Sequence, residues 1–314
     1  MEPSAITDRI WGVLLGQAVG DALGLGTEFM TAAEVAHTYP GGLHHYEQIV
    51  ADRHRSRFER GAWSDDTAMM LCIVHSLIEK QGHIDLHDIA CRFKAWWKEK
   101  PMGIGTATNN VLALGDYTVH PEACAEMVWR LSRCQNAPNG GVMRTGVIGL
   151  LHTDVARHAV NVCRLTHADP RCAGSCAVIA TLVHTLVYEN SVPPLSLLLQ
   201  IASPYERETT AWLTRAAESP NLHPLQLDDS LTMGYTLKTM AAAVWALYHC
   251  HNFTEGLLAV VNAGGDADTN AAVTGCVLGA RYGAQSIPPH LADGLLHRQE
   301  LAVVAQQLTN LFGY

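Results

Sequence analysis

Apolar residues recur at helical spacing along most of the chain. In residues 6–25, Ile6, Ile10, Val13, Leu14 and Ala18 fall on one face of a helix, as a repeat of about 3.6 residues requires. Apolar and polar residues alternate over no convincing run, so no strand is predicted and the expected fold class is all-α. Similar patterns, bounded by Gly, Pro or capping residues, predict further helices at residues 64–80, 86–98, 105–114, 121–134, 142–151, 154–166, 172–189, 194–202, 205–217, 234–250, 254–262, 269–282 and 289–307.

Three glycines mark a second face of the first predicted helix. Gly12, Gly16 and Gly20 are spaced four residues apart, so they line up along the helix surface. This spacing also occurs where helices pair inside membranes, but Gln17 and Asp21 interrupt the apolar stretch here. The glycines therefore predict that this helix packs closely against another helix in the core.

Composition narrows the class of protein. Hydrophobic residues make up 48% of the 314 residues and charged residues 16%, which indicates a globular core and not a disordered chain. The formal charge is −9, from 21 basic and 30 acidic residues. The basic residues form no extended cluster, so no nucleic-acid partner is expected.

Cysteine usage and the absence of long apolar runs bear on location. The nine cysteines are irregularly spaced, mostly inside apolar helical runs, which favours buried thiols in a reducing compartment over a disulfide framework. No basic segment precedes the first apolar stretch, and no window of 18 residues is both apolar and uncharged. A cytoplasmic protein without a membrane span is therefore expected.

Two acidic motifs, about two hundred residues apart, open apolar helices. The first runs from Ser64 to Thr67 (Ser-Asp-Asp-Thr), and the second runs from Asp266 to Thr269 (Asp-Ala-Asp-Thr) after two glycines. Taken alone, the first motif is more often an N-cap, since Ser and Asp favour that position. Together, the carboxylates and hydroxyls form a ligand set suited to Mg²⁺ or Mn²⁺.

The positions of these motifs bear on domain organisation. No low-complexity segment, interdomain linker or internal repeat separates them. If the two helix starts meet, they form a binuclear metal centre that can activate water. We therefore expect one compact domain over residues 1–314, an orthogonal multi-helix bundle with a central binuclear metal cleft.

Two glycine-rich segments and their neighbours are weaker candidates. Glu28 follows a glycine-rich exit from the first helix and can act as a general base or gate, although an ordinary loop glutamate is the more common case. Asp21 is expected to satisfy backbone amides and not to take part in the chemistry. The segment from Gly103 to Thr108 exposes amides at a helix start, which suits a phosphate, but a simple turn is equally compatible with it.

Three further positions have both a structural and a functional interpretation. Arg144, in the segment from Asn139 to Arg144, lies on an apolar stretch and should pair with a structural carboxylate, the commoner case, or with a ligand. His167 near a helix C-terminus favours a dipole contact or local cap over a ligand contact. Tyr235 can stack on a base, but most helical tyrosines belong to the core.

Read in order, these motifs resemble the ADP-ribosylglycohydrolase family. The resemblance extends from the glycine-rich segment Gly12–Gly24 to the second acidic motif. The first motif begins with Ser64 where the family usually has Thr, which keeps the ligating hydroxyl. The resemblance implies an all-α fold, two Mg²⁺ or Mn²⁺ ions, and cleavage of the bond between ADP-ribose and an acceptor side chain.

The resemblance also assigns expected roles to individual residues. Glu28 matches the family's acidic residue on a flap over the site. Either Glu28 or Asp66 is expected to accept the proton of the attacking water, and the sequence does not decide between them. The expected metal ligands are Ser64, Asp65, Asp66, Asp266, Asp268 and Thr269. The expected substrate-binding residues, with Tyr235 taken from its own sequence context, are Gly103, Gly105, Thr106, Asn139, Gly140, Met143, Arg144, His167 and Tyr235.

The expected partner is an ADP-ribosylated protein, and a monomer is expected. Arginine is the favoured acceptor, with serine-linked and O-acyl ADP-ribose left open. A different class of function is an antitoxin or immunity protein that neutralises an ADP-ribosyltransferase toxin by direct binding, alongside hydrolysis or in its place. An intact ligand set favours the enzyme, because a protein that only blocks a toxin has no need of it.

Overall fold

The computed structural model describes residues 3–313, so residues 1, 2 and 314 of the predicted domain lie outside its description. This part of the chain is helical, with one isolated bridge between Pro138 and Tyr235 and no strand. The all-α prediction is confirmed. The α-helices are α1 (Pro3–Gly24), α2 (Ala32–Thr38), α3 (Asp65–Glu79), α4 (Leu86–Lys98), α5 (Thr106–Leu112), α6 (Pro121–Leu131), α7 (Val142–Thr145), α8 (Val155–Arg164), α9 (Pro170–His184), α10 (Leu195–Ala202), α11 (Arg207–Glu218), α12 (Thr236–His249), α13 (Phe253–Val261), α14 (Ala267–Tyr282), α15 (Pro289–Asp293) and α16 (Arg298–Phe312).

Most predicted helices are present within a few residues of their expected ends, but three predictions need correction. The predicted helix 142–151 is α7 followed by a 3₁₀ segment, η3 (Gly146–Leu150), and the predicted helix 172–189 ends in a π-helical turn, η4 (Thr185–Glu189). The predicted helix 289–307 is wrong, because α15 ends before Gly294 and α16 begins at Arg298. A Cβ at Gly294 would lie 2.8 Å from the Tyr46 ring and 2.9 Å from the His290 carbonyl oxygen, so a side chain would not fit at this break between the two helices.

The short helix α2 was not predicted, although the sequence contains a signal for it. Thr31 accepts a hydrogen bond from the Glu34 amide, and the Glu34 carboxylate accepts one from the Thr31 amide. This capping box fixes the start of a helix even when the helix buries little apolar surface. Only Val35 of α2 is buried, so the apolar pattern was too weak to indicate the helix.

The glycines of α1 bring that helix into close contact with α14, as predicted. A Cβ at Gly16 would lie 2.2 Å from the Gly275 carbonyl oxygen, and one at Gly20 would lie 2.0 Å from the Ala271 carbonyl oxygen. One turn further along α1, a Cβ at Gly24 would lie 2.4 Å from Cα of Asp268. The two helices are therefore antiparallel, and the C-terminal end of α1 lies against the N-terminal end of α14.

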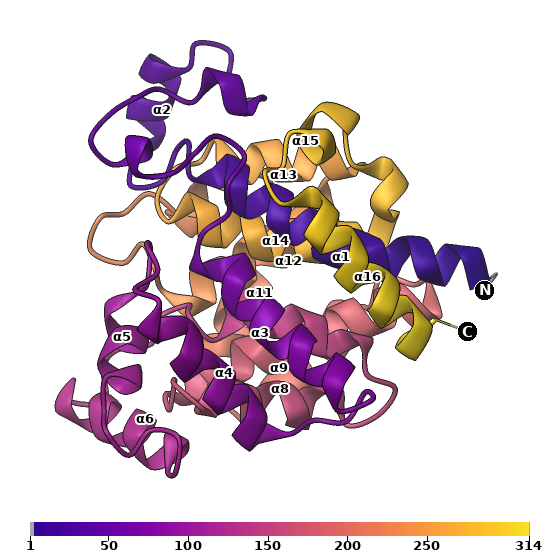
Figure 1. Ribbon diagram of the computed structural model, residues 1–314. Helices are drawn as coiled ribbons and strands as arrows, with labels where there is room; N and C mark the ends of the chain where they lie inside the picture. The colour runs from indigo at the N-terminus through magenta and orange to yellow at the C-terminus, as the bar shows by residue number, and fades with distance from the viewer. Residues whose placement is uncertain (1–2, 314) are drawn as a thin grey trace.

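The remaining helices surround this central pair (Figure 1). Helices α12 and α13 pack on α14, while α16 packs on both α1 and α3. The α2 region forms one extremity of the molecule and α5 with α6 another, and the two ends of the chain lie on the same side. This arrangement leaves the start of α14 and the end of α1 close to α3.

One stretch has the length and composition of a membrane span. It comprises α9 and η4, from Pro170 to Glu189, with a mean hydropathy of 1.4 and 78% of the window buried inside the protein. Helix α9 packs against α8, α12 and η3, so its apolar surface is accounted for by the core.

Candidate metal centre and substrate cleft

The two acidic motifs meet, as the sequence predicted. Asp66 lies in the first turn of α3 and Thr269 in the first turn of α14. Oδ2 of Asp66 accepts hydrogen bonds from the Ser64 hydroxyl at 3.0 Å and from the Thr269 hydroxyl at 3.2 Å. The Asp66 carboxylate therefore contacts a side chain that lies 203 residues away in the sequence.

Asp21 supports the start of α3 from the last turns of α1. Its carboxylate accepts hydrogen bonds from the backbone amides of Ser64 and Thr67, each at 2.9 Å, and from the Thr67 hydroxyl at 2.6 Å. The prediction that Asp21 satisfies backbone amides is confirmed. Asp21 thereby fixes the first motif against α1, which is already fixed against α14.

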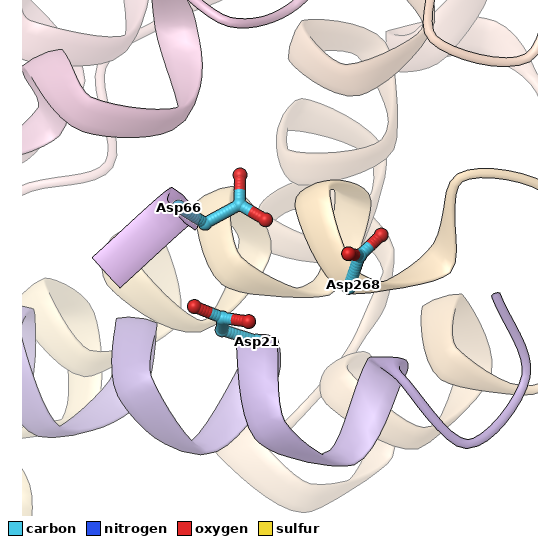
Figure 2. Close-up of side chains that lie close together, drawn as sticks. All are labelled: Asp21, Asp66 and Asp268. Carbon is cyan, nitrogen blue, oxygen red and sulfur yellow. The ribbon is translucent and has the colours of Figure 1, made fainter. Parts of the chain in front are cut away.

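Asp21 also belongs to a carboxylate cluster that the sequence did not indicate. One oxygen each of Asp21, Asp66 and Asp268 lie within 4.8 Å of one another. Figure 2 shows the three side chains extending from separate helices into a shared space. Glu28, Asp266 and Asp268 form a second group, in which one oxygen of each also lies within 4.8 Å of the others. Asp268 is common to both groups, so the two groups form one continuous acidic centre.

Burial and mutual repulsion raise the pKa values of these carboxyl groups. Loss of solvent, and then the neighbouring carboxylates, raise the pKa of Asp65 from 3.8 to about 7 and place the pKa of Asp66 well above its usual value. Burial, followed by Glu28, raises the pKa of Asp266 to about 6 and that of Asp268 well above its ordinary value. Without a compensating positive charge, the acidic centre therefore favours protonated carboxyl groups.

The donor set fits a hard divalent cation. Oδ1 of Asp66 and Oδ1 of Asp268 are buried and have no hydrogen-bond partner among the described residues. Buried acceptors without partners are costly, and a cation would satisfy both oxygens and offset the repulsion. Carboxylate and hydroxyl oxygens are the ligands that Mg²⁺ and Mn²⁺ prefer.

The acidic centre opens into a cleft of about 970 Å³. Glu28, Asp65, Asp266, Asp268 and Thr269 contribute to its lining, whereas Ser64 and Asp66 do not. The cleft also contains most of the predicted substrate-binding residues, namely Gly103, Gly105, Thr106, Asn139, Gly140, Met143, His167 and Tyr235. The structure therefore gathers most of the predicted ligands and substrate-binding residues around one space.

Two of the cleft-lining segments contact the acidic centre directly. The Asn139 amide donates hydrogen bonds to Asp266 at 2.6 Å and to the Thr239 hydroxyl at 3.0 Å. A Cβ at Gly103 would lie 3.0 Å from Oδ1 of Asp65, and φ at Gly103 is +89°, a conformation that favours glycine. The loop before α5 can approach Asp65 because this position carries no side chain.

His167 is held as a neutral imidazole beside Gly140. Its Nδ1 lies 2.7 Å from the Thr166 hydroxyl, and burial, followed by the charge of Arg144, lowers its pKa to about 3. Nε2 has no hydrogen-bond partner among the described residues. A Cβ at Gly140 would lie 2.8 Å from Cε1 of His167, so glycine allows this close approach.

The partners of Arg144 differ from the carboxylate that was expected. Its guanidinium is fully buried and donates to the Thr166 hydroxyl at 2.6 Å, and its central carbon lies 4.5 Å from the centre of the Phe93 ring. No carboxylate pairs with it among the described residues, so the predicted structural ion pair is wrong. Arg144 is absent from the cleft lining and supports Thr166, the residue that contacts His167.

A group of residues around Tyr235 was not anticipated from the sequence. The Tyr235 hydroxyl donates to Glu208 at 2.5 Å, and the Arg171 guanidinium carbon lies 5.6 Å from the Tyr235 ring centre. Trp212 approaches the same ring edge-on at 6.0 Å. All four residues line the cleft. Arg171 on α9 and Glu208 and Trp212 on α11 have the ordinary spacing of amphipathic helices, so these three gave no separate signal.

Comparisons with known proteins agree with this geometry. The family model described as ADP-ribosylglycohydrolase matches residues 2–314. The ADP-ribosyl-[dinitrogen reductase] glycohydrolase of Rhodospirillum rubrum is 30% identical, over 92% of this chain and 90% of that protein. The ADP-ribosylarginine hydrolase Tri1 of Serratia proteamaculans is 26% identical, over 96% of this chain and 79% of that protein.

A solved structure extends the comparison to the fold. A chain of an ADP-ribosylglycohydrolase-related protein complex superposes with a TM-score of 0.76 and 30% sequence identity, and the match covers 98% of this chain and 99% of that one. The fold and acidic cleft thus define a glycohydrolase class of enzyme. The chain belongs to the ADP-ribosylglycohydrolase family and is a hydrolase that acts on ADP-ribose.

Proposed function

We propose that this enzyme uses Mg²⁺ or Mn²⁺ to remove ADP-ribose from modified arginine side chains of proteins. The observation that supports this function best is the meeting of the two acidic motifs beside the cleft, joined through Asp66 and Thr269. The buried oxygens without partners on Asp66 and Asp268 supply the reason for a cation. Residues 1–314 would act as one domain.

Two cations would be held by the residues of the two motifs. The proposed ligands are Ser64, Asp65, Asp66, Asp266, Asp268 and Thr269, with Asp21 and Glu28 completing the two carboxylate groups. When bound, such cations activate water and orient the hydroxyls of the reacting ribose. The protein contributes a fixed set of oxygens, because Asp21 and Asn139 hold the two motifs in place through hydrogen bonds.

The remaining cleft residues would bind and orient the substrate. Amides of the loop from Gly103 to Thr106 can hold the diphosphate. Asn139, Gly140 and the neutral imidazole of His167 can contact the ribose, and the Tyr235 ring offers a surface for the base. Cleavage of the glycosidic bond proceeds through an oxocarbenium-like transition state, which negative charge beside the sugar stabilises.

Glu28 is the better placed of the two proposed proton acceptors. Its side chain lines the cleft, whereas Asp66 is absent from the lining and its Oδ2 already accepts two hydroxyl hydrogen bonds. A general base has to reach the proton that it removes. Glu28 would take the proton of the attacking water, and Asp66 would serve the cations.

Arginine is proposed as the acceptor because of the names of the relatives. Both Tri1 proteins, from Serratia proteamaculans and Pseudomonas putida, are described as ADP-ribosylarginine hydrolases, and each match covers at least 96% of this chain. The direct test is a release assay on arginine-linked and serine-linked ADP-ribosyl proteins, run side by side in Mg²⁺ and in EDTA. Faster release from arginine in Mg²⁺ supports the proposal, and faster release from serine contradicts the acceptor assignment.

Substitution of the ligands gives a second test of the same function. Asp65→Ala and Asp268→Ala should each abolish release while the helical content remains that of the wild type. Turnover that persists in either purified variant at saturating Mg²⁺ contradicts the metal-dependent proposal. Protection of a target protein from a transferase that is unaffected by EDTA would instead indicate neutralisation by direct binding.

A further inference from the structure

The segment 52–58 holds the turn that carries Glu28. The Arg55 guanidinium is buried and donates hydrogen bonds to the backbone carbonyls of Gly26 and Glu28, each at 2.7 Å. Arg55 also forms an ion pair with Asp52. A charge-assisted clamp of this kind fixes the backbone on which the Glu28 side chain stands.

His54 holds the Glu28 side chain itself. Nε2 of His54 lies 2.6 Å from Oε2 of Glu28. The His54 ring lies between two aromatic neighbours, with its centre 5.1 Å from that of Phe29 and 6.3 Å from that of Phe58. Its backbone amide donates to Asp52 at 2.9 Å, so both the ring and the backbone of His54 are fixed.

The opposite side of the turn is attached to the second acidic motif. The Phe29 amide donates to the Gly265 carbonyl, and the Gly265 amide donates to the Met30 carbonyl, each at 2.7 Å. An oxygen of Glu28 lies within 4.8 Å of oxygens of Asp266 and Asp268. The Glu28 carboxylate therefore stands between the His54 ring and two other carboxylates, which repel it when ionised.

We propose that His54 is a positioning residue that keeps the Glu28 carboxylate at the acidic centre. Without the His54 contact, a flexible side chain next to two like charges would turn away from them. With it, Glu28 stays where it can serve the cations and the attacking water. This inference rests on the proposed function for its kinetic consequences, but the effect on cation binding follows from the geometry alone.

Two substitutions separate the hydrogen bond from the packing of the ring. His54→Phe keeps an aromatic ring between Phe29 and Phe58 and removes the donor, whereas His54→Gln keeps an N–H donor and removes the ring. His37→Phe is the matched control, because His37 is exposed on α2. Mn²⁺ affinity, measured by calorimetry, and kcat and KM for ADP-ribose release are the readouts.

The hydrogen bond predicts a specific order among these variants. His54→Phe should weaken Mn²⁺ binding and lower kcat by about 10-fold, with little change in KM, as for other residues that orient metal-binding carboxylates. His54→Gln should recover most of both losses, and His37→Phe should match the wild type. If His54→Phe does not fold, His54→Ala removes the same donor and takes its place.

A double substitution tests whether His54 acts through Glu28. In a Glu28→Gln background, His54→Phe should cause no further loss of kcat or of Mn²⁺ affinity. Equal losses in both backgrounds, or wild-type Mn²⁺ affinity in His54→Phe, would overturn the inference. A wild-type protein that releases no ADP-ribose would overturn the proposed function instead, and the Mn²⁺ measurements would still decide the role of His54.

Discussion

Replacing Asp268 by Asn should stabilise the cation-free protein and at the same time weaken cation binding. Asp268 is the residue shared by the two carboxylate groups, and its Oδ1 is buried without a partner. Asn keeps the size of the side chain but removes one negative charge from the centre. The loss of repulsion should therefore show as a gain in the free energy of unfolding whenever no cation is bound.

The size of the gain follows from the raised pKa values. A carboxyl group whose pKa is about 6 in the folded state and 3.8 otherwise, as for Asp266, destabilises the fold by about 3 kcal/mol once it is ionised. The pKa of Asp268 also lies well above its ordinary value because of burial and the neighbouring carboxylates, so neutralising it should raise the free energy of unfolding at pH 8. For a chain of this length, a gain of about 3 kcal/mol would appear as a rise of about 5 °C in Tm.

A bound cation should offset this difference in stability between the two proteins. Mg²⁺ at about 100 times its Kd stabilises a protein that binds it only in the folded state by about 2.7 kcal/mol. The wild type should gain this stability and Asp268→Asn should not, so the difference measured in EDTA should nearly vanish in Mg²⁺.

Urea unfolding at pH 8, in EDTA and in Mg²⁺, measures both effects on the same samples. Asp116→Asn removes a charge from an exposed position and should change stability in neither buffer. The reasoning is refuted if Asp268→Asn is less stable than the wild type in EDTA, or if Mg²⁺ stabilises both proteins equally.

Further predictions concern pH and three glycines. The folded-state pKa values of Asp65 and Asp266 are raised from 3.8 to about 7 and about 6. The contribution of these two groups to the free energy of unfolding is therefore complete below pH 3.8 and is lost as the pH rises through about 6–7. The Tm of the cation-free protein, followed by scanning fluorimetry, should therefore fall over this range, and a rise would contradict the assignment. Gly16→Ala places a Cβ 2.2 Å from a backbone oxygen and should cost about 3 kcal/mol in urea unfolding. Gly115→Ala, with no atom within 4 Å, should stay within about 1 kcal/mol of the wild type; similar losses in both would refute the packing argument. Gly140→Ala should displace His167 and lower kcat/KM for ADP-ribose release by about 10- to 100-fold, and unchanged kinetics would show that this contact is not needed.

The fold was largely predictable because its helices follow strong local rules. Apolar periodicity identifies the buried face of a helix, and the four-residue glycine spacing in α1 identified a face that another helix could approach closely. Neither pattern names the partner helix. That α14 is the partner, and that it runs antiparallel to α1, depends on tertiary packing that no local rule encodes.

The candidate site was predictable where its residues lie next to one another in the sequence. The two acidic motifs and the loops at Gly103 and Asn139 are short runs, and the structure gathers them around one cleft. Asp21 and His54 were not put forward as parts of the site, because the partners of each side chain lie in a distant segment of the sequence. The structural carboxylate expected for Arg144 is absent among the described residues, because a hydroxyl, a carbonyl and an aromatic ring contact the guanidinium in its place.

The rate of ADP-ribose release from an arginine-modified protein, measured in EDTA and again after Mg²⁺ is restored, tests the central claim most directly. We predict no release in EDTA, full recovery with Mg²⁺, and no recovery in Asp268→Ala. Release at an undiminished rate in EDTA would contradict a cation-dependent site formed by the two acidic motifs.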